Sequence, residues 1–213
     1  MKLLLLYGVN CTKEIWDYIN PYFLDFEVDY VEYPHEVTAK ANNVEDLTKW
    51  VYDTYHSIKY DVIIGHSLGG IIALQLAANY NMEFSKIIFL DTNLKPAEAF
   101  YRNLMTKENT EKYGNILSQM FDKERCFYSK ELFKALQADF DYTEILDNIP
   151  QKIFGIYGDR GIPAYANRIH DLNLSDKSLE RINLIFISNA CHMPMVENPE
   201  ELSQVIHHIV RNA

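Results

Sequence analysis

Short apolar runs alternate along the chain with longer segments in which apolar residues recur at helical spacing. Continuous apolar runs bounded by turn residues are typical of buried strands, and recurrence every three or four residues is typical of helices. The pattern predicts six strands, at residues 2–7, 26–33, 60–65, 85–91, 151–158 and 182–188. It predicts helices between them, at residues 14–23, 43–58, 67–80, 163–172 and 199–212.

Strands without polar alternation indicate a parallel sheet with helices on both faces. Because crossovers between parallel strands are right-handed, we expect an α/β fold with a doubly wound, mostly parallel six-stranded sheet. Residues 93–149 interrupt this alternation with helical patterns, many aromatic residues and no strand. We expect them to form a helical lid inserted into a core made of residues 1–92 and 150–213. Most of the aromatic side chains should pack in the small core of the insertion.

Composition is consistent with one domain that buries a core, since 48% of the 213 residues are hydrophobic. The net charge of −10 argues against nucleic acid or an anionic membrane as partner. The N-terminal apolar run is shorter than a signal peptide requires, and no later run is long enough to span a bilayer. The three cysteines lack metal-binding spacing. We therefore expect a cytoplasmic protein with reduced thiols.

A glycine-rich turn separates the third expected strand from a strongly apolar helix. Residues 65–69 read GHSLG, which fits the pattern G-x-S-x-G. Between a strand and a helix, this pattern predicts a tight turn that strains the serine backbone and exposes its side chain. Glycine is needed two residues before and after the serine, because larger side chains clash there. The helix N-terminus also favours developing negative charge. These features predict that Ser67 is a catalytic nucleophile.

With this turn in place, nearly the whole chain resembles the lid-bearing esterases, thioesterases and carbon–carbon hydrolases of the α/β-hydrolase superfamily. In that family the catalytic residues follow the order serine, acid, histidine. The histidine lies after the last strand, in a segment similar to GHMPMxENPEEL. Residues 188–202 here read SNACHMPMVENPEEL. The resemblance implies that His192 is the catalytic base, while His66 is expected to point away from the serine.

The same resemblance implies where the acid lies. The family places it after the next-to-last strand, where the segment 149–163 contains Asp159. An alternative alignment puts Gly161 at the acid position, but the loop holds no other carboxylate. The expected acid is therefore Asp159. The alternative is Asp91, at the end of the strand expected at residues 85–91.

The resemblance further implies an oxyanion hole made of two backbone N–H groups, those of Leu68 and Val9. Tyr7 stands where the family often has histidine, and Gly8 is retained. Three basic residues could offset the acidic surface locally, Lys95, Arg102 and Arg160, and they are expected to be solvated charges.

Together these features predict a serine hydrolase that cleaves an ester or thioester of a small, partly apolar substrate through a Ser-His-Asp triad and an acyl-enzyme. No metal or organic cofactor is expected. One alternative is a carbon–carbon bond hydrolase or lyase that uses the same triad. A second is a non-catalytic ligand receptor on the same fold. The sequence does not indicate an oligomeric state.

Overall fold

A computed structural model describes residues 1–212 and contains a six-stranded sheet in which every neighbouring pair of strands is parallel. The order across the sheet is β2-β1-β3-β4-β5-β6. All six strands lie where the apolar runs predict them, and the sheet is wholly rather than mostly parallel. Their bounds are β1 Lys2–Leu6, β2 Glu27–Tyr30, β3 Val62–His66, β4 Lys86–Leu90, β5 Lys152–Gly158 and β6 Ile182–Ile187.

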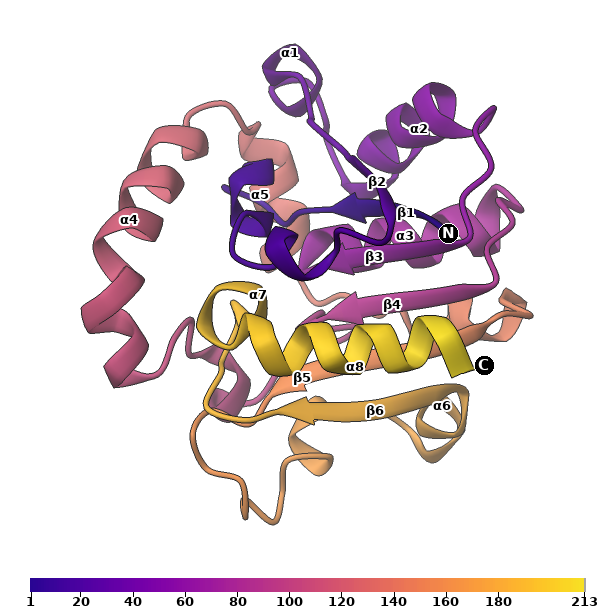
Figure 1. The fold of residues 1–213 in the computed structure, drawn as a ribbon. Coiled ribbons are helices and arrows are strands. Elements are labelled where there is room, and N and C mark those ends of the chain that lie inside the picture. Colours follow the sequence, from indigo (N-terminus) through magenta and orange to yellow (C-terminus); the bar gives the residue numbers. More distant parts are fainter. Residues whose placement is uncertain (213) are drawn as a thin grey trace.

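Helices cover both faces of the sheet (Figure 1). Helices α2 (Val44–Tyr55) and α3 (Leu68–Asn79) pack together on one face, and α8 (Pro199–Asn212) crosses the other. Helix α3 is buried from Leu68 to Ala77. This matches its sequence, which is apolar on nearly all sides, as expected of a helix in the middle of the fold.

Two predicted helices are wrong. Residues 14–23 form two short 3-10 helices, η1 (Lys13–Trp16) and η2 (Asn20–Tyr22), because Pro21 lacks a backbone N–H and begins a new turn. Residues 163–172 form only the 3-10 helix η5 (His170–Leu172). Two helices were not predicted because they are short, α1 (His35–Thr38) and α7 (Pro194–Glu197), and α6 (Asp176–Arg181) is also additional.

Between β4 and β5 the chain forms a helical insertion. It contains η3 (Ala99–Arg102), α4 (Lys107–Arg125), α5 (Lys130–Gln137) and η4 (Thr143–Asn148). The side chain of Thr106 accepts a hydrogen bond from the backbone N–H of Asn109 and starts α4, and Ser129 starts α5 in the same way. Helix α4 lies beyond the carboxyl ends of the strands (Figure 1), where residues that follow the strands meet.

Within the described residues, none of the helices combines the length and the apolar character needed to cross a membrane.

Candidate active site

The turn between β3 and α3 holds Ser67 in a strained backbone conformation, with φ 53° and ψ −120°. A non-glycine residue in this region costs about 1–3 kcal/mol, so the surrounding structure must hold it in place. The Ser67 N–H donates to the carbonyl of Leu90 at 2.9 Å, and the Thr92 hydroxyl donates to the Ser67 carbonyl at 2.9 Å. Strand β4 therefore fixes the turn.

Close packing explains the glycines of the turn. A Cβ on Gly65 would lie 2.2 Å from the carbonyl oxygen of Gly69, and a Cβ on Gly69 would lie 2.6 Å from that of Leu6. Gly8, in the loop after β1, packs directly against the Ser67 side chain, since an added Cβ would lie 2.8 Å from the Ser67 Cβ. The loop after β1 and the serine turn are thus in contact.

His192 lies in the loop between β6 and α7, and its ring is hydrogen-bonded to a carboxylate. Its Nδ1–H donates to Asp91 Oδ1 at 3.0 Å. Asp91 follows β4 directly, is completely buried, and has a φ of 43°. Ser67 and His192 line the same two cavities, each of about 170 Å³. Within residues 1–212, Ser67 Oγ forms no hydrogen bond; such contacts often tighten only when substrate binds.

The carboxylate expected beside His192 was that of Asp159, and the structure has Asp91 there instead. The Asp159 carboxylate accepts hydrogen bonds from the backbone N–H groups of Gly161, at 2.8 Å, and Asn189, at 2.7 Å. It therefore holds two loops together rather than the histidine. The two candidates follow neighbouring strands, β4 and β5, so chain order alone does not separate them.

Arg160 is not the solvated charge that the sequence suggested. Its guanidinium is buried and forms a two-point ion pair with Asp91, with both N···O distances at 2.7 Å. Burial would raise the pKa of the Asp91 carboxyl, but the Arg160 charge and the hydrogen bonds from His192 and Arg160 lower it to about 2. Asp91 is consequently ionised at neutral pH.

His66 is buried and lines one of the two cavities. Its Nε2–H donates to the backbone carbonyl of His192 at 2.9 Å, so it supports the loop that carries His192. Burial, followed by repulsion from His192, lowers the pKa of His66 to about 3. A histidine that stays neutral in this way acts as a fixed hydrogen-bond donor.

The two residues expected to form an oxyanion hole lie beside Ser67. Val9 lines both cavities, and Leu68 lines one of them. The Val9 backbone N–H has no acceptor among residues 1–212, and the Leu68 N–H belongs to the first turn of α3. Tyr7 points elsewhere, since its hydroxyl accepts a hydrogen bond from the Tyr33 N–H at 2.9 Å.

Sequence reasoning missed one residue of this site, Glu197 of α7. One carboxylate oxygen accepts from the backbone N–H groups of Cys191, at 2.6 Å, and Met193, at 3.2 Å, on either side of His192. The other accepts from the Thr106 N–H at 3.0 Å and the Asn109 amide at 3.1 Å, at the start of α4. Glu197 therefore joins the histidine loop to the insertion. Its burial within an otherwise surface-like ENPEEL segment is not visible from the sequence.

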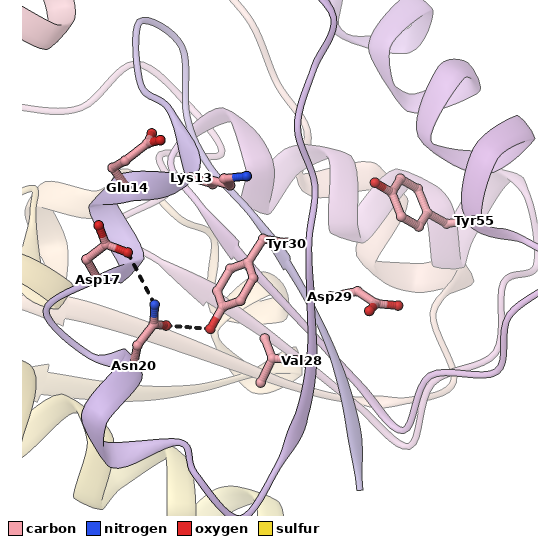
Figure 2. A pocket seen from close by; sticks show the side chains of 8 residues that line it. All are labelled: Lys13, Glu14, Asp17, Asn20, Val28, Asp29, Tyr30 and Tyr55. Atoms are coloured by element: carbon pink, nitrogen blue, oxygen red, sulfur yellow. Dashed lines mark hydrogen bonds between the residues drawn. The ribbon is translucent and has the colours of Figure 1, made fainter.

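A larger cleft, of about 710 Å³, lies away from Ser67, between η1, η2 and strand β2 (Figure 2). Figure 2 shows a chain of hydrogen bonds from Asp17 through Asn20 to Tyr30. Asp29 at its wall accepts from the Tyr60 hydroxyl at 2.6 Å. Since these polar groups satisfy one another, we place the candidate site at Ser67 rather than here.

The part of the chain that the structure describes contains no group of three or more His, Cys, Asp or Glu side chains placed to hold a metal ion.

The known proteins that match this sequence are described as esterases. A family model described as "Putative esterase" matches residues 40–142. The chain is 27% identical over 143 residues to a pimeloyl-[acyl-carrier protein] methyl ester esterase from Vibrio vulnificus (strain YJ016), covering 64% of this chain and 52% of that protein. The chain thus spans about half the length of the curated relative that it matches.

Solved structures show the same fold. A hydrolase from Oleispira antarctica superposes with a TM-score of 0.75 at 17% identity, covering 100% of this chain and 91% of that one. The enol-lactonase from Burkholderia xenovorans LB400 has a TM-score of 0.74 at 14% identity, with 98% and 90% covered. Together with the parallel sheet and the serine turn, these matches define an α/β-hydrolase fold. The chain is similar in sequence to esterases and in fold to α/β-hydrolases, in agreement with the resemblance seen in the sequence.

Proposed function

We propose that the chain is a serine hydrolase that cleaves a small ester or thioester through an acyl-enzyme, with Ser67 as nucleophile, His192 as general base and Asp91 as acid. The observation that carries the proposal is the buried hydrogen bond between His192 Nδ1 and Asp91 Oδ1, made by a histidine that shares two cavities with a strained serine. A nucleophile, a base and a group that orients the base are the parts that nucleophilic acyl transfer requires.

The proposed reaction follows the triad logic. His192 Nε2 takes the Ser67 hydroxyl proton while Oγ attacks the carbonyl carbon. Asp91 holds the Nδ1–H and so keeps the basic nitrogen directed at the serine. His192 then gives the proton to the leaving group and activates water for deacylation. Every step uses side chains of this chain.

The negative charge of the tetrahedral intermediate is assigned to the backbone N–H groups of Val9 and Leu68. The unbonded Val9 N–H and the position of Leu68 in the first turn of α3 support this assignment. One such donor is worth about 2.7–4 kcal/mol of transition-state stabilisation.

The two cavities indicate the size of the substrate. One is mostly apolar, and the structure gives it six nonpolar or aromatic wall residues: Val9, Leu68, Ile71, Leu136, Phe140 and Tyr142. Its volume of about 170 Å³ is close to that of a cavity of about 150 Å³ that holds benzene. We therefore assign it to an acyl group of about six carbon atoms. The second cavity, lined in part by Asn10, Phe121 and Met193, is left for the alcohol or thiol part.

The insertion supports the proposed lid role by supplying walls of both cavities. Leu104 and Phe121 contribute to one, and Leu136 and Phe140 to the other. Another aromatic residue of the insertion, Tyr128, is buried and lies beside the ring of Phe133. Residues 93–149 therefore carry specificity in this proposal. The name of the curated relative, an esterase for a pimeloyl methyl ester, fits an ester of a short acyl chain.

The deciding experiment labels the purified protein with a fluorophosphonate, for wild type, Ser67→Ala and Asp91→Asn, and measures turnover of p-nitrophenyl esters from C2 to C12. We expect labelling of wild type only at Ser67, turnover that peaks near C4–C6, and loss of both in Ser67→Ala. Labelling without ester turnover would favour the carbon–carbon hydrolase or lyase. A folded wild-type protein that neither labels nor turns over any ester would favour the receptor and contradict the proposal.

A further inference from the structure

The acid of the proposed triad is shared between the guanidinium of Arg160 and the imidazole of His192, and this arrangement points to a role for Arg160. We propose that Arg160 is a positioning residue that fixes the Asp91 carboxylate and balances its charge, so that His192 serves as a base in more acidic solution than a triad without the arginine would allow. The proposal rests on the proposed triad.

The contacts between Arg160 and Asp91 are those of a fully buried, two-point ion pair. Arg160 Nη1 donates to Oδ2 and Nη2 donates to Oδ1, each at 2.7 Å. The Arg160 side chain is 2% exposed and that of Asp91 is 0% exposed. The Gly158 N–H adds a third donor to Oδ2 at 3.1 Å. Such fork-shaped pairs fix the plane of a carboxylate as well as its charge.

Arg160 is itself held rigidly. Its φ is 57°, its backbone N–H donates to the Ala190 carbonyl at 2.8 Å, and its Nη1 also donates to the Gly158 carbonyl at 2.7 Å. The guanidinium lies 4.4 Å from the centre of the Tyr101 ring, over its face. The loop is further braced by Asp159, through its bonds to Gly161 and Asn189. The carboxylate expected to be catalytic thus supports the arginine that pairs with the carboxylate beside the histidine.

The shared oxygen explains the effect on His192. Asp91 Oδ1 accepts both from Arg160 Nη2, at 2.7 Å, and from His192 Nδ1, at 3.0 Å. In a triad without a cation beside the acid, the carboxylate charge is balanced only when the histidine is protonated. Here the guanidinium balances it at all times, and it repels a protonated imidazole across the same oxygen. Asp91 therefore orients His192 without strongly retaining its proton.

Four of the other titratable side chains around this pair are uncharged at neutral pH, while the basic Arg102 and the acidic Asp139 line a surface cavity together with His192. Burial raises the pKa of the Tyr101 and Tyr157 hydroxyls and raises that of the Cys191 thiol to about 12, while His66 stays neutral. The nearby carboxylates, Asp159 and Glu197, are both engaged by backbone N–H groups. Arg160 is the cation in direct contact with Asp91 within residues 1–212.

The test is the pH dependence of kcat/KM for a neutral short-chain ester, in wild type, Arg160→Met, Arg160→Lys and Arg168→Met. Arg168 is a matched control, because it also stacks on an aromatic ring, that of Phe186 at 4.4 Å, but contacts no carboxylate. In the acid limb of this profile, kcat/KM falls as the pH is lowered. We expect this limb to move up by about one to two pH units in Arg160→Met, because the Asp91 charge then acts on His192 unopposed. Arg160→Lys, which keeps the charge, should lie between, and Arg168→Met should match wild type.

A merely structural role predicts a different result: kcat/KM falls by the same factor at every pH and the acid limb of Arg160→Met does not move. That result overturns the proposal. If Arg160→Met does not fold, Arg160→Gln decides, because it keeps a neutral N–H donor and must still raise the acid limb. Failure of the proposed function gives a different result. In that case Ser67→Ala turns over the ester as fast as wild type, whatever the Arg160 variants do.

Discussion

At the residue scale, the site is built from strained positions at the ends of adjacent strands. Ser67, Asp91 and Arg160 follow β3, β4 and β5, and all three have a positive φ. Residues other than glycine rarely adopt this conformation, and it persists where surrounding contacts enforce it. Hydrogen bonds between the ends of the strands enforce this conformation. They also bring the side chains of these residues to one edge of the sheet.

The first prediction separates the two carboxylates. Asp91→Asn should lower kcat by about 10⁴-fold, because an amide does not hold the Nδ1–H tautomer of His192 that places the basic nitrogen toward Ser67. Asp159→Asn should lower kcat less than about tenfold while lowering Tm, since it loses loop contacts at Gly161 and Asn189. Steady-state kinetics and thermal melts on both variants provide the measurement. A larger kcat loss in Asp159→Asn than in Asp91→Asn would restore Asp159 as the acid.

The serine turn and the histidine segment were readable from local sequence, because each has a pattern tied to its backbone geometry. The acid was not readable in this way. Asp91 and Asp159 both follow apolar strands. Which of the two carboxylates contacts His192 depends on where the imidazole ring lies in the folded protein. Arg160 was hidden for the same reason, because a basic residue in a loop is usually solvated and only the fold shows that this one is buried.

At the scale of elements, helix α7 connects the catalytic loop to the insertion. The backbone N–H of His192 donates to the Leu104 carbonyl at 3.1 Å, and Asn109 donates to the Asn189 carbonyl at 3.0 Å. Glu197 adds four accepted hydrogen bonds across the same junction. Burial raises the pKa of its carboxyl, and the surrounding donors oppose this shift. The start of α4 is therefore attached to the loop that carries His192.

The second prediction tests this junction. In Glu197→Gln one acceptor becomes an NH₂ group that faces two N–H donors, and unpaired buried donors cost about 1–3 kcal/mol each. We expect Tm to fall by about 5–10 °C, since 1 kcal/mol corresponds to about 2–4 °C in a chain of this size. We also expect kcat/KM to fall, because His192 is no longer held from both sides.

Glu200→Gln is the matched control for this measurement. Glu200 is exposed in the first turn of α8 and forms no side-chain hydrogen bond within the described residues, so its Tm and kcat/KM should stay close to wild type. Equal changes in the two variants would mean that the Glu197 contacts do not hold the loop.

Strands were predicted more accurately than helices. A buried strand in a parallel sheet reads as a nearly continuous apolar run, as in residues 62–64 and 87–90, and this pattern is hard to mistake. The segments 14–23 and 163–172 have helical spacing, yet they fold as 3-10 turns and loops. Periodicity reports which side chains face inward, but it does not distinguish a helix from a loop that packs the same residues.

At the scale of the whole molecule, the net charge of −10 surrounds a site whose cavities are partly apolar. A field of this sign lowers the local concentration of anionic substrates and raises no barrier for neutral ones. Salt screens it, because the Debye length falls to about 10 Å at 0.1 M ionic strength. The charge therefore favours neutral esters over anionic ones at low salt.

The third prediction follows from this field. Between about 10 mM and 300 mM salt, kcat/KM for an ester with a carboxylate on its acyl end should rise by about two- to fivefold, and that for its neutral methyl-capped counterpart should stay constant. Measurements on both esters at fixed pH, corrected for the rate of Ser67→Ala, test this. A fall in kcat/KM of the anionic ester with salt would instead indicate a local cationic contact in the site.

The sequence by itself determined the parallel sheet, the position of the insertion, the strained turn at Ser67 and the segment that holds His192, because each is encoded in residues that are neighbours along the chain. Tertiary structure alone decided that Asp91 meets His192, that Arg160 is buried against Asp91, and that Glu197 joins the histidine loop to α4. These contacts join residues about 70 to 100 positions apart. Local patterns carry no signal for such pairings, since they depend on how strand ends and loops meet in space.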